Sequence, residues 1–181
     1  MRLKNLLKSR IQSDWEQDSE FAESYLPEIK RILRENAMLF ISVVKADEER
    51  DLEKATDLLV KVENGDVAVR VRRPTKKQKR DFTLRSWRKS GVKTELQKIR
   101  EGFGRFYLYI WLDQELEVAD WILVDLNALR ASGCLKNSLE EILNKDGKTA
   151  FVILSLKKLK NSNCLLSWHG NLPQLLQPRL L

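Results

Sequence analysis

The residues with the clearest chemical potential lie in the segment VAVRVRRPTKKQKRDFTLRSWRKSG, positions 67–91. Its first residues alternate as in a β-strand, which puts Val67 and Val69 on one face and Arg70 and Arg72 on the other. A dense block of Lys and Arg follows. Because an arginine fork matches two phosphate oxygens at once, arginines on one strand face indicate a surface that grips neighbouring phosphates.

Positive charge is concentrated in this part of the chain. The sequence holds 33 Lys and Arg against 26 Asp and Glu, a formal net charge of +7. Residues 66–105 contain fourteen Lys and Arg and only four acids, so the excess there is larger than that of the whole chain. Such a patch attracts a polyanion, most simply nucleic acid. A solvated basic loop without a partner remains the alternative. The candidate nucleic-acid-binding residues are Arg70, Arg72, Arg73, Lys76, Lys77, Arg85 and Arg88.

Several other kinds of site lack the residues they need. Cys134 and Cys164 form no CxxC motif and His169 is the only histidine, which argues against structural zinc and against a Ser-His-Asp or Cys-His mechanism. Both glycine-rich phosphate-binding loops, GxxxxGK[ST] and GxGxxG, are missing. No apolar run approaches the ~20 residues of a membrane span. Lys4 and Lys8 interrupt the apolar N-terminal run, so we expect no secretory signal and a cytoplasmic protein.

The first half of the chain predicts helices and then strands. A capping box at Ser13–Glu16 predicts a helix to about Tyr25, and Pro27 suits the first turn of a helix over 28–36. The apolar run at 37–44 predicts a buried strand. Asn64-Gly65 between two β-rich runs predicts a hairpin of strands 55–62 and 67–73, with Gly65 at positive φ.

The second half continues with alternating strands and helices. We expect strands at 81–87, 105–113, 119–126 and 149–156. A helix is expected over KTELQKIREGFG, with Leu96 and Ile99 on one face and Gly102 or Gly104 ending it. LNALRASGCL and NSLEEILNKDG are expected to be short helical pieces. This order predicts an α+β or α/β fold with a mixed central sheet and flanking helices, as one domain over 1–160 with an irregular tail at 161–181.

The element order resembles the restriction-endonuclease-like fold of the PD-(D/E)XK nucleases, over about residues 20 to 113. That family has a core of helix, three strands, helix and strand. Its second core strand begins with Asp, and its third carries Glu-x-Lys. In this chain LFISVV would be the first core strand, TDLLV would carry Asp57, VAVRVRR would be the third strand, and KTELQK would be the helix. The resemblance implies a Mg²⁺-dependent nuclease acting on DNA or RNA.

The third strand departs from the family pattern. Arg70 and Arg72 stand where the family has Glu and Lys, and arginine offers no oxygen to a cation such as Mg²⁺. Some members of the superfamily carry the acid on the following helix. By that resemblance a displaced catalytic site would use Asp57, Asp81, Glu95 and Lys98, the three carboxylates being candidate ligands for Mg²⁺. The metal would activate water, and Lys98 would stabilise developing charge or orient that water.

Each of these residues also has an ordinary structural interpretation. Asp57 facing Arg70 or Arg72 would be a cross-strand ion pair, and Glu95 with Lys98 an exposed helix pair. Asp81 would bound a strand. Trp87 is either a base-stacking platform or part of the core. Three functions therefore stay open: a nuclease-like domain, a non-catalytic nucleic-acid-binding module, and an interaction protein with an acidic protein partner.

Overall fold

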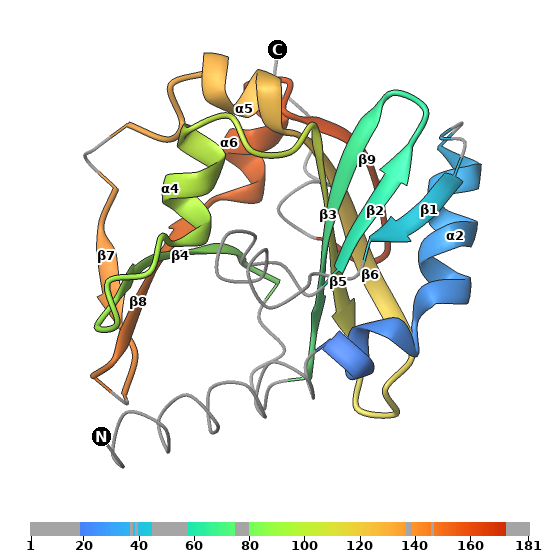
Figure 1. The fold of residues 1–181 in the computed structure, drawn as a ribbon, viewed down its shortest axis with the longest axis horizontal. Helices are drawn as coiled ribbons and strands as arrows, with labels where there is room; N and C mark the ends of the chain where they lie inside the picture. The colour runs from blue at the N-terminus through green and yellow to red at the C-terminus, as the bar shows by residue number, and fades with distance from the viewer. Residues whose placement is uncertain are drawn as a thin grey trace.

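The computed structural model describes residues 19–36, 38, 40–44, 58–74, 80–136, 139–145 and 147–172. Figure 1 shows the strands of these ranges in two sheets, with helices packed around them. The larger sheet has the order β1 (Phe40–Val44), β2 (Leu58–Val62), β3 (Gly65–Arg72), β5 (Phe106–Leu112), β6 (Val118–Asp125) and β9 (Leu165–His169). The smaller sheet has the order β4 (Phe82–Arg88), β8 (Thr149–Leu154) and β7 (Glu141–Leu143). The helices are α2 (Leu26–Glu35), α4 (Glu95–Arg100), α5 (Leu126–Ala131) and α6 (Leu156–Asn161).

The larger sheet is mixed, as the sequence predicts. Strands β1, β2 and β3 form an antiparallel meander, β3 runs parallel to β5, and β6 and β9 continue antiparallel. A parallel pair needs a long crossover connection, and here the chain between β3 and β5 includes β4 and α4. The α+β fold class is therefore confirmed.

The hairpin of β2 and β3 is also confirmed. Val62 pairs with Gly65, and Gly65 has a φ of 135°. A Cβ atom at this position would lie 2.8 Å from the Cβ of Arg105. Both the backbone angle and the close approach of Arg105 therefore favour glycine at this turn.

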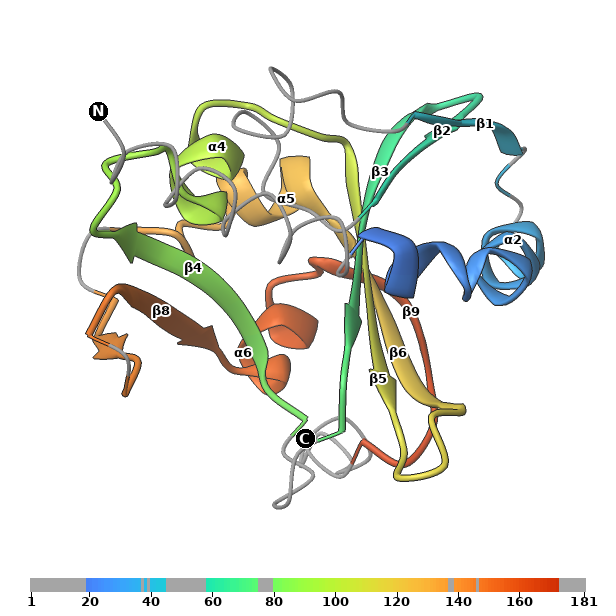
Figure 2. The same ribbon diagram turned by 60° about the horizontal axis from the view of Figure 1, so that its bottom comes forward.

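Both faces of the larger sheet are covered, and Figure 2 shows the two layers on either side of it. On one face, Val67, Val69 and Val71 of β3 pack with Ile29 and Leu33 of α2. On the other face, the odd-numbered aromatic residues of β5 pack with α4, α5, α6 and the smaller sheet: Tyr107, Tyr109 and Trp111. The strand expected at 105–113 is confirmed as β5, and all of its residues from Phe106 to Leu112 are buried.

Helices α4 and α5 and strand β8 lie within the predicted segments. Helix α2 begins two residues before the predicted range 28–36, with Pro27 in its first turn. Leu96 and Ile99 form the buried face of α4, as expected. None of the described helices is long and apolar enough to cross a membrane. The capping box at Ser13–Glu16 lies outside the described residues.

Two predictions about the C-terminal third are wrong. The segment NSLEEILNKDG is not helical where described: Glu141–Leu143 forms β7 and pairs with β8. The turn between them is closed by the amide of Asn144, which donates to the carbonyl of Thr149 at 2.8 Å. The segment after residue 160 is not irregular throughout, because β9 pairs with β6 along the edge of the larger sheet.

Candidate functional site

Strands β3 and β5 present their polar side chains on one shared face. In their parallel register Ala68 lies beside Tyr107, Arg70 beside Tyr109 and Arg72 beside Trp111. Alternation along a strand puts all of these on the face opposite α2. Arg70 and Arg72 therefore point toward the side of the sheet that α4 and the smaller sheet cover.

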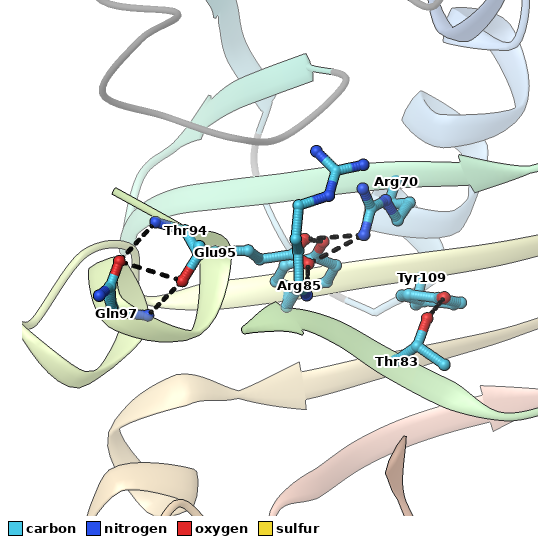
Figure 3. A network of polar contacts seen from close by, with 8 residues as sticks. Arg70, Thr83, Arg85, Thr94, Glu95, Gln97 and Tyr109 are labelled. Carbon is cyan, nitrogen blue, oxygen red and sulfur yellow. Dashed lines mark hydrogen bonds and ion pairs between the residues drawn. The ribbon is translucent and has the colours of Figure 1, made fainter. Parts of the chain in front are cut away.

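Glu95 of α4 lies at the centre of a buried polar network on that face (Figure 3). Its side chain is only 2% exposed. Nη1 of Arg70 donates to both carboxylate oxygens, at 3.1 Å to Oε1 and 2.9 Å to Oε2. The backbone N–H of Arg85 donates to Oε2 at 2.9 Å, and the Tyr107 hydroxyl donates to Oε1. Donors from β3, β4 and β5 thus converge on one carboxylate.

The start of α4 holds Glu95 in this position. Thr94 is the N-cap residue, and a capping box joins its hydroxyl and backbone to Gln97. Glu95 is therefore the first helical residue, where the N-terminal end of the helix favours negative charge. The interpretation of Glu95 and Lys98 as an exposed helix pair is wrong, since both side chains are buried.

Polar contacts tie β4 to the larger sheet at further points. The Thr83 hydroxyl and the Tyr109 hydroxyl are 2.8 Å apart (Figure 3). Arg80, just before β4, forms an ion pair with Asp120 of β6. Thr83 and Arg80 are near the start of β4, and Arg85 is at its middle, where it meets Glu95. The network therefore fixes the position of β4 relative to the larger sheet.

The predicted nucleic-acid-binding arginines lie at the end of β3 and along β4. Arg72 is half-buried, and the guanidinium carbon of Arg73 lies 4.3 Å from the ring centre of Phe21. Arg85 and Arg88 are half-buried on β4. Arg70 is 11% exposed and bound to Glu95, so its main role is to stabilise the fold. Lys76 and Lys77 lie outside the described residues.

Trp87 is a surface residue. It sits in β4, an edge strand of the smaller sheet, and is 41% exposed. By contrast, Trp111 and Trp121 are buried in the larger sheet. The interpretation of Trp87 as a core residue is therefore wrong, and a surface role remains.

The predicted Mg²⁺ ligands do not form a described metal site. Among the residues that the structure describes, no group of three or more His, Cys, Asp or Glu could hold a metal ion. Asp57 lies outside these residues. Asp81 precedes β4, and at about 3.3 Å per strand residue it is roughly 13 Å of chain from Arg85, whose amide binds Glu95. A metal at Glu95 would also have to displace Arg70.

Sequence reasoning missed several members of the network. The sequence pattern places Tyr107 and Tyr109 only within a predicted strand, yet their hydroxyls bond to Glu95 and Thr83. Asp120 was part of a predicted strand, and a charged residue within the apolar run ADWILV was the available signal for its buried ion pair. Buried charges are normally paired, so Asp120 predicts a cationic partner such as Arg80.

Tyr107 makes the stability of the folded protein depend on pH in the alkaline range. Burial raises the pKa of its hydroxyl well above the usual value of 10.0, and the Glu95 carboxylate raises it further. Above pH 10 the unfolded chain loses this proton while the folded chain keeps it. The contribution of Tyr107 to stability is therefore complete below pH 10 and falls above it, by about 1.4 kcal/mol per pH unit.

This predicts how Tyr107→Phe changes the stability curve. Urea denaturation should show the variant less stable than the parent at pH 8, because the bond to Glu95 is lost. The difference between parent and variant should shrink steadily between pH 10 and pH 11. A difference that stays constant over this range would contradict a buried, protonated Tyr107.

The comparisons with known proteins identify no relative. No family model matches the chain, no curated protein matches it, and no solved structure matches its fold. The function proposed for this protein therefore rests on the chain's own residues.

Proposed function

We propose that this protein binds nucleic acid through the basic segment 66–105. One observation carries the proposal: eight of the eleven basic residues described in this segment reach the surface. Lys98 is buried, and Arg70 and Arg80 are mostly buried in ion pairs with Glu95 and Asp120. The other eight reach the surface from the end of β3, from β4 and the turn after it, from the ends of α4 and from the residue before β5. A surface with this excess of positive charge attracts phosphate-rich polymers and steers them toward the protein.

The arginines of this segment differ in their surroundings, and we propose different roles for them. Arg70 is held by the buried Glu95, and it helps to fix β4 against β3. Arg72, Arg85 and Arg88 are half-buried, so the fold limits the conformations of each side chain while part of the residue meets solvent. Pre-positioned guanidinium groups lose less conformational freedom when they bind phosphate. We assign the phosphate contacts to these residues and to Arg73.

The topology supports the proposed likeness to the restriction-endonuclease-like fold. Helix α2, strands β1, β2 and β3, helix α4 and strand β5 follow in the order that the family core requires, with β4 inserted before α4. Metal-dependent hydrolysis stays a prediction, because it depends on Asp57. It would also require Glu95 to exchange Arg70 for Mg²⁺. Nucleic-acid binding needs neither condition, so it is the function that we favour.

A salt titration tests the proposal. The protein should bind a generic DNA duplex weakly and without strong sequence preference. Each neutralised phosphate releases counterions, so log affinity should fall with log salt at about −0.9 per contact, and four contacts give a slope of about −3.6. Fluorescence anisotropy over a series of salt concentrations measures this slope. Absence of binding at low salt would favour an acidic protein partner.

A further inference from the structure

Trp87 is the most exposed tryptophan among the described residues, and its surroundings are those of a nucleic-acid contact. It is 41% exposed, whereas Trp111 and Trp121 are buried and Trp168 is half-buried. Large aromatic side chains usually lie in the core of small domains. The register of β4 with β8 shifts between Arg85 and Trp87, and such β-bulges often redirect a side chain at a functional surface.

The chain around Trp87 provides positive charge on both sides. Arg85 precedes it by two residues, and Arg88 and Lys89 follow it directly. At about 3.3 Å per residue in a strand, all three backbone positions lie within roughly 7 Å of Trp87. Each nucleotide has both a flat base and a phosphate group. An exposed indole ring flanked by cations therefore matches both parts of a nucleotide.

The start of α4 covers part of the edge of β4. β4 is an edge strand of the smaller sheet, with β8 as its only strand partner among the described residues. The start of α4 covers the middle of the edge, because Glu95 accepts from the Arg85 amide and the Thr94 hydroxyl donates to the Ser86 carbonyl at 3.3 Å. These contacts satisfy the backbone there, which disfavours pairing with another strand at this point. Trp87 lies just beyond them.

We infer that Trp87 stacks on the bases of single-stranded nucleic acid, with Arg85, Arg88 and Lys89 beside the phosphates. In a duplex the base faces are already stacked, and opening a step costs several kcal/mol. In a single strand they are accessible. Base–aromatic stacking tolerates any base, which agrees with binding that has no sequence preference. This inference rests on the proposed nucleic-acid binding and adds the strand preference.

The test compares oligothymidylate with a mixed-sequence duplex of equal length, at one moderate salt concentration. The parent protein should bind the single strand more tightly. Trp87→Ala should weaken single-strand binding about tenfold or more and change duplex binding less than about twofold. Trp87→Phe should retain part of the affinity, because the smaller ring still stacks. Leu166→Ala, which truncates an exposed apolar residue on β9, is the matched control. It should change neither the affinity for the single strand nor the affinity for the duplex. Thermal melting verifies that each variant folds.

The outcomes separate this inference from the function on which it rests. If the parent binds duplex and single strand equally and Trp87→Ala changes neither, stacking is overturned and nucleic-acid binding stands. Equal weakening of both ligands by Trp87→Ala would also overturn the strand preference. If the parent binds neither ligand even at low salt, both proposals fall.

Discussion

Glu95→Gln is expected to lower the free energy of unfolding by about 3–5 kcal/mol, the usual cost of removing one partner of a buried ion pair. The amide keeps the shape of the side chain but removes its charge. Arg70, 11% exposed, then faces a neutral group, and the Tyr107 hydroxyl and Arg85 amide lose an ionised acceptor. Urea denaturation at neutral pH measures the loss.

Glu101→Gln is the matched control for this change. Glu101 follows α4 directly and forms an ion pair with Lys93 at 2.7 Å, but both side chains are more than half exposed. Exposed pairs contribute about 0–1 kcal/mol, so this variant should stay close to the parent. The double variant Arg70→Met/Glu95→Gln should recover part of the loss, because it no longer buries an uncompensated guanidinium. Equal, small effects of Glu95→Gln and Glu101→Gln would contradict the network.

Gly170→Ala is expected to destabilise the protein by about 3 kcal/mol or more. The new Cβ atom would lie 2.1 Å from Oδ1 of Asp120 and 2.7 Å from the carbonyl of Ala119, and the φ of Gly170 is +99°. Strained backbone and overpacking each cost about 1–3 kcal/mol. The change would also push Asp120 against Arg80, its partner before β4.

Gly91→Ala separates the two causes. Gly91 also has a positive φ, +73°, but a Cβ atom there would meet nothing within 4 Å. Only the cost of the left-handed conformation remains, about 1–2 kcal/mol. Thermal unfolding should therefore give a clearly lower melting temperature for Gly170→Ala than for Gly91→Ala. The reverse order would show that β9 and Asp120 are not packed as described.

Local signals in the sequence were sufficient for the hairpin and for most strands. Asn64-Gly65 specified the turn because the backbone there needs a positive φ, and the aromatic run at 105–113 specified β5. Strand β7 was missed because EEIL was interpreted as helical, although the following Asp146-Gly147 is a hairpin signal of the same kind. Strand β9 was missed because its pairing with β6 joins residues that are 41 to 48 positions apart in the chain.

The polar network could not be predicted in the same way. Glu95 meets residues 70, 85 and 107, and each comes from a different strand. Spacing along α4 relates Glu95 to Lys98 only, which led to the interpretation of an exposed pair. Tertiary packing decides which side chains meet, and no local pattern reports it. Tertiary packing also decides that β4 pairs with β8 in the smaller sheet and not with the strands of the larger one.

Two variants that each remove four positive charges should differ in how they bind generic duplex DNA. The first replaces Arg72, Arg73, Lys76 and Lys77 with Ala. The second replaces four exposed lysines outside the basic segment: Lys136, Lys145, Lys157 and Lys158. If the basic segment is the binding surface, the first variant should show weaker binding and a flatter salt slope, by up to about 3.6 units. The second variant should bind DNA with nearly the same affinity and salt slope as the parent protein. If the first variant binds as well as the parent at every salt concentration, or if both variants lose the same amount, the basic segment is not the binding surface.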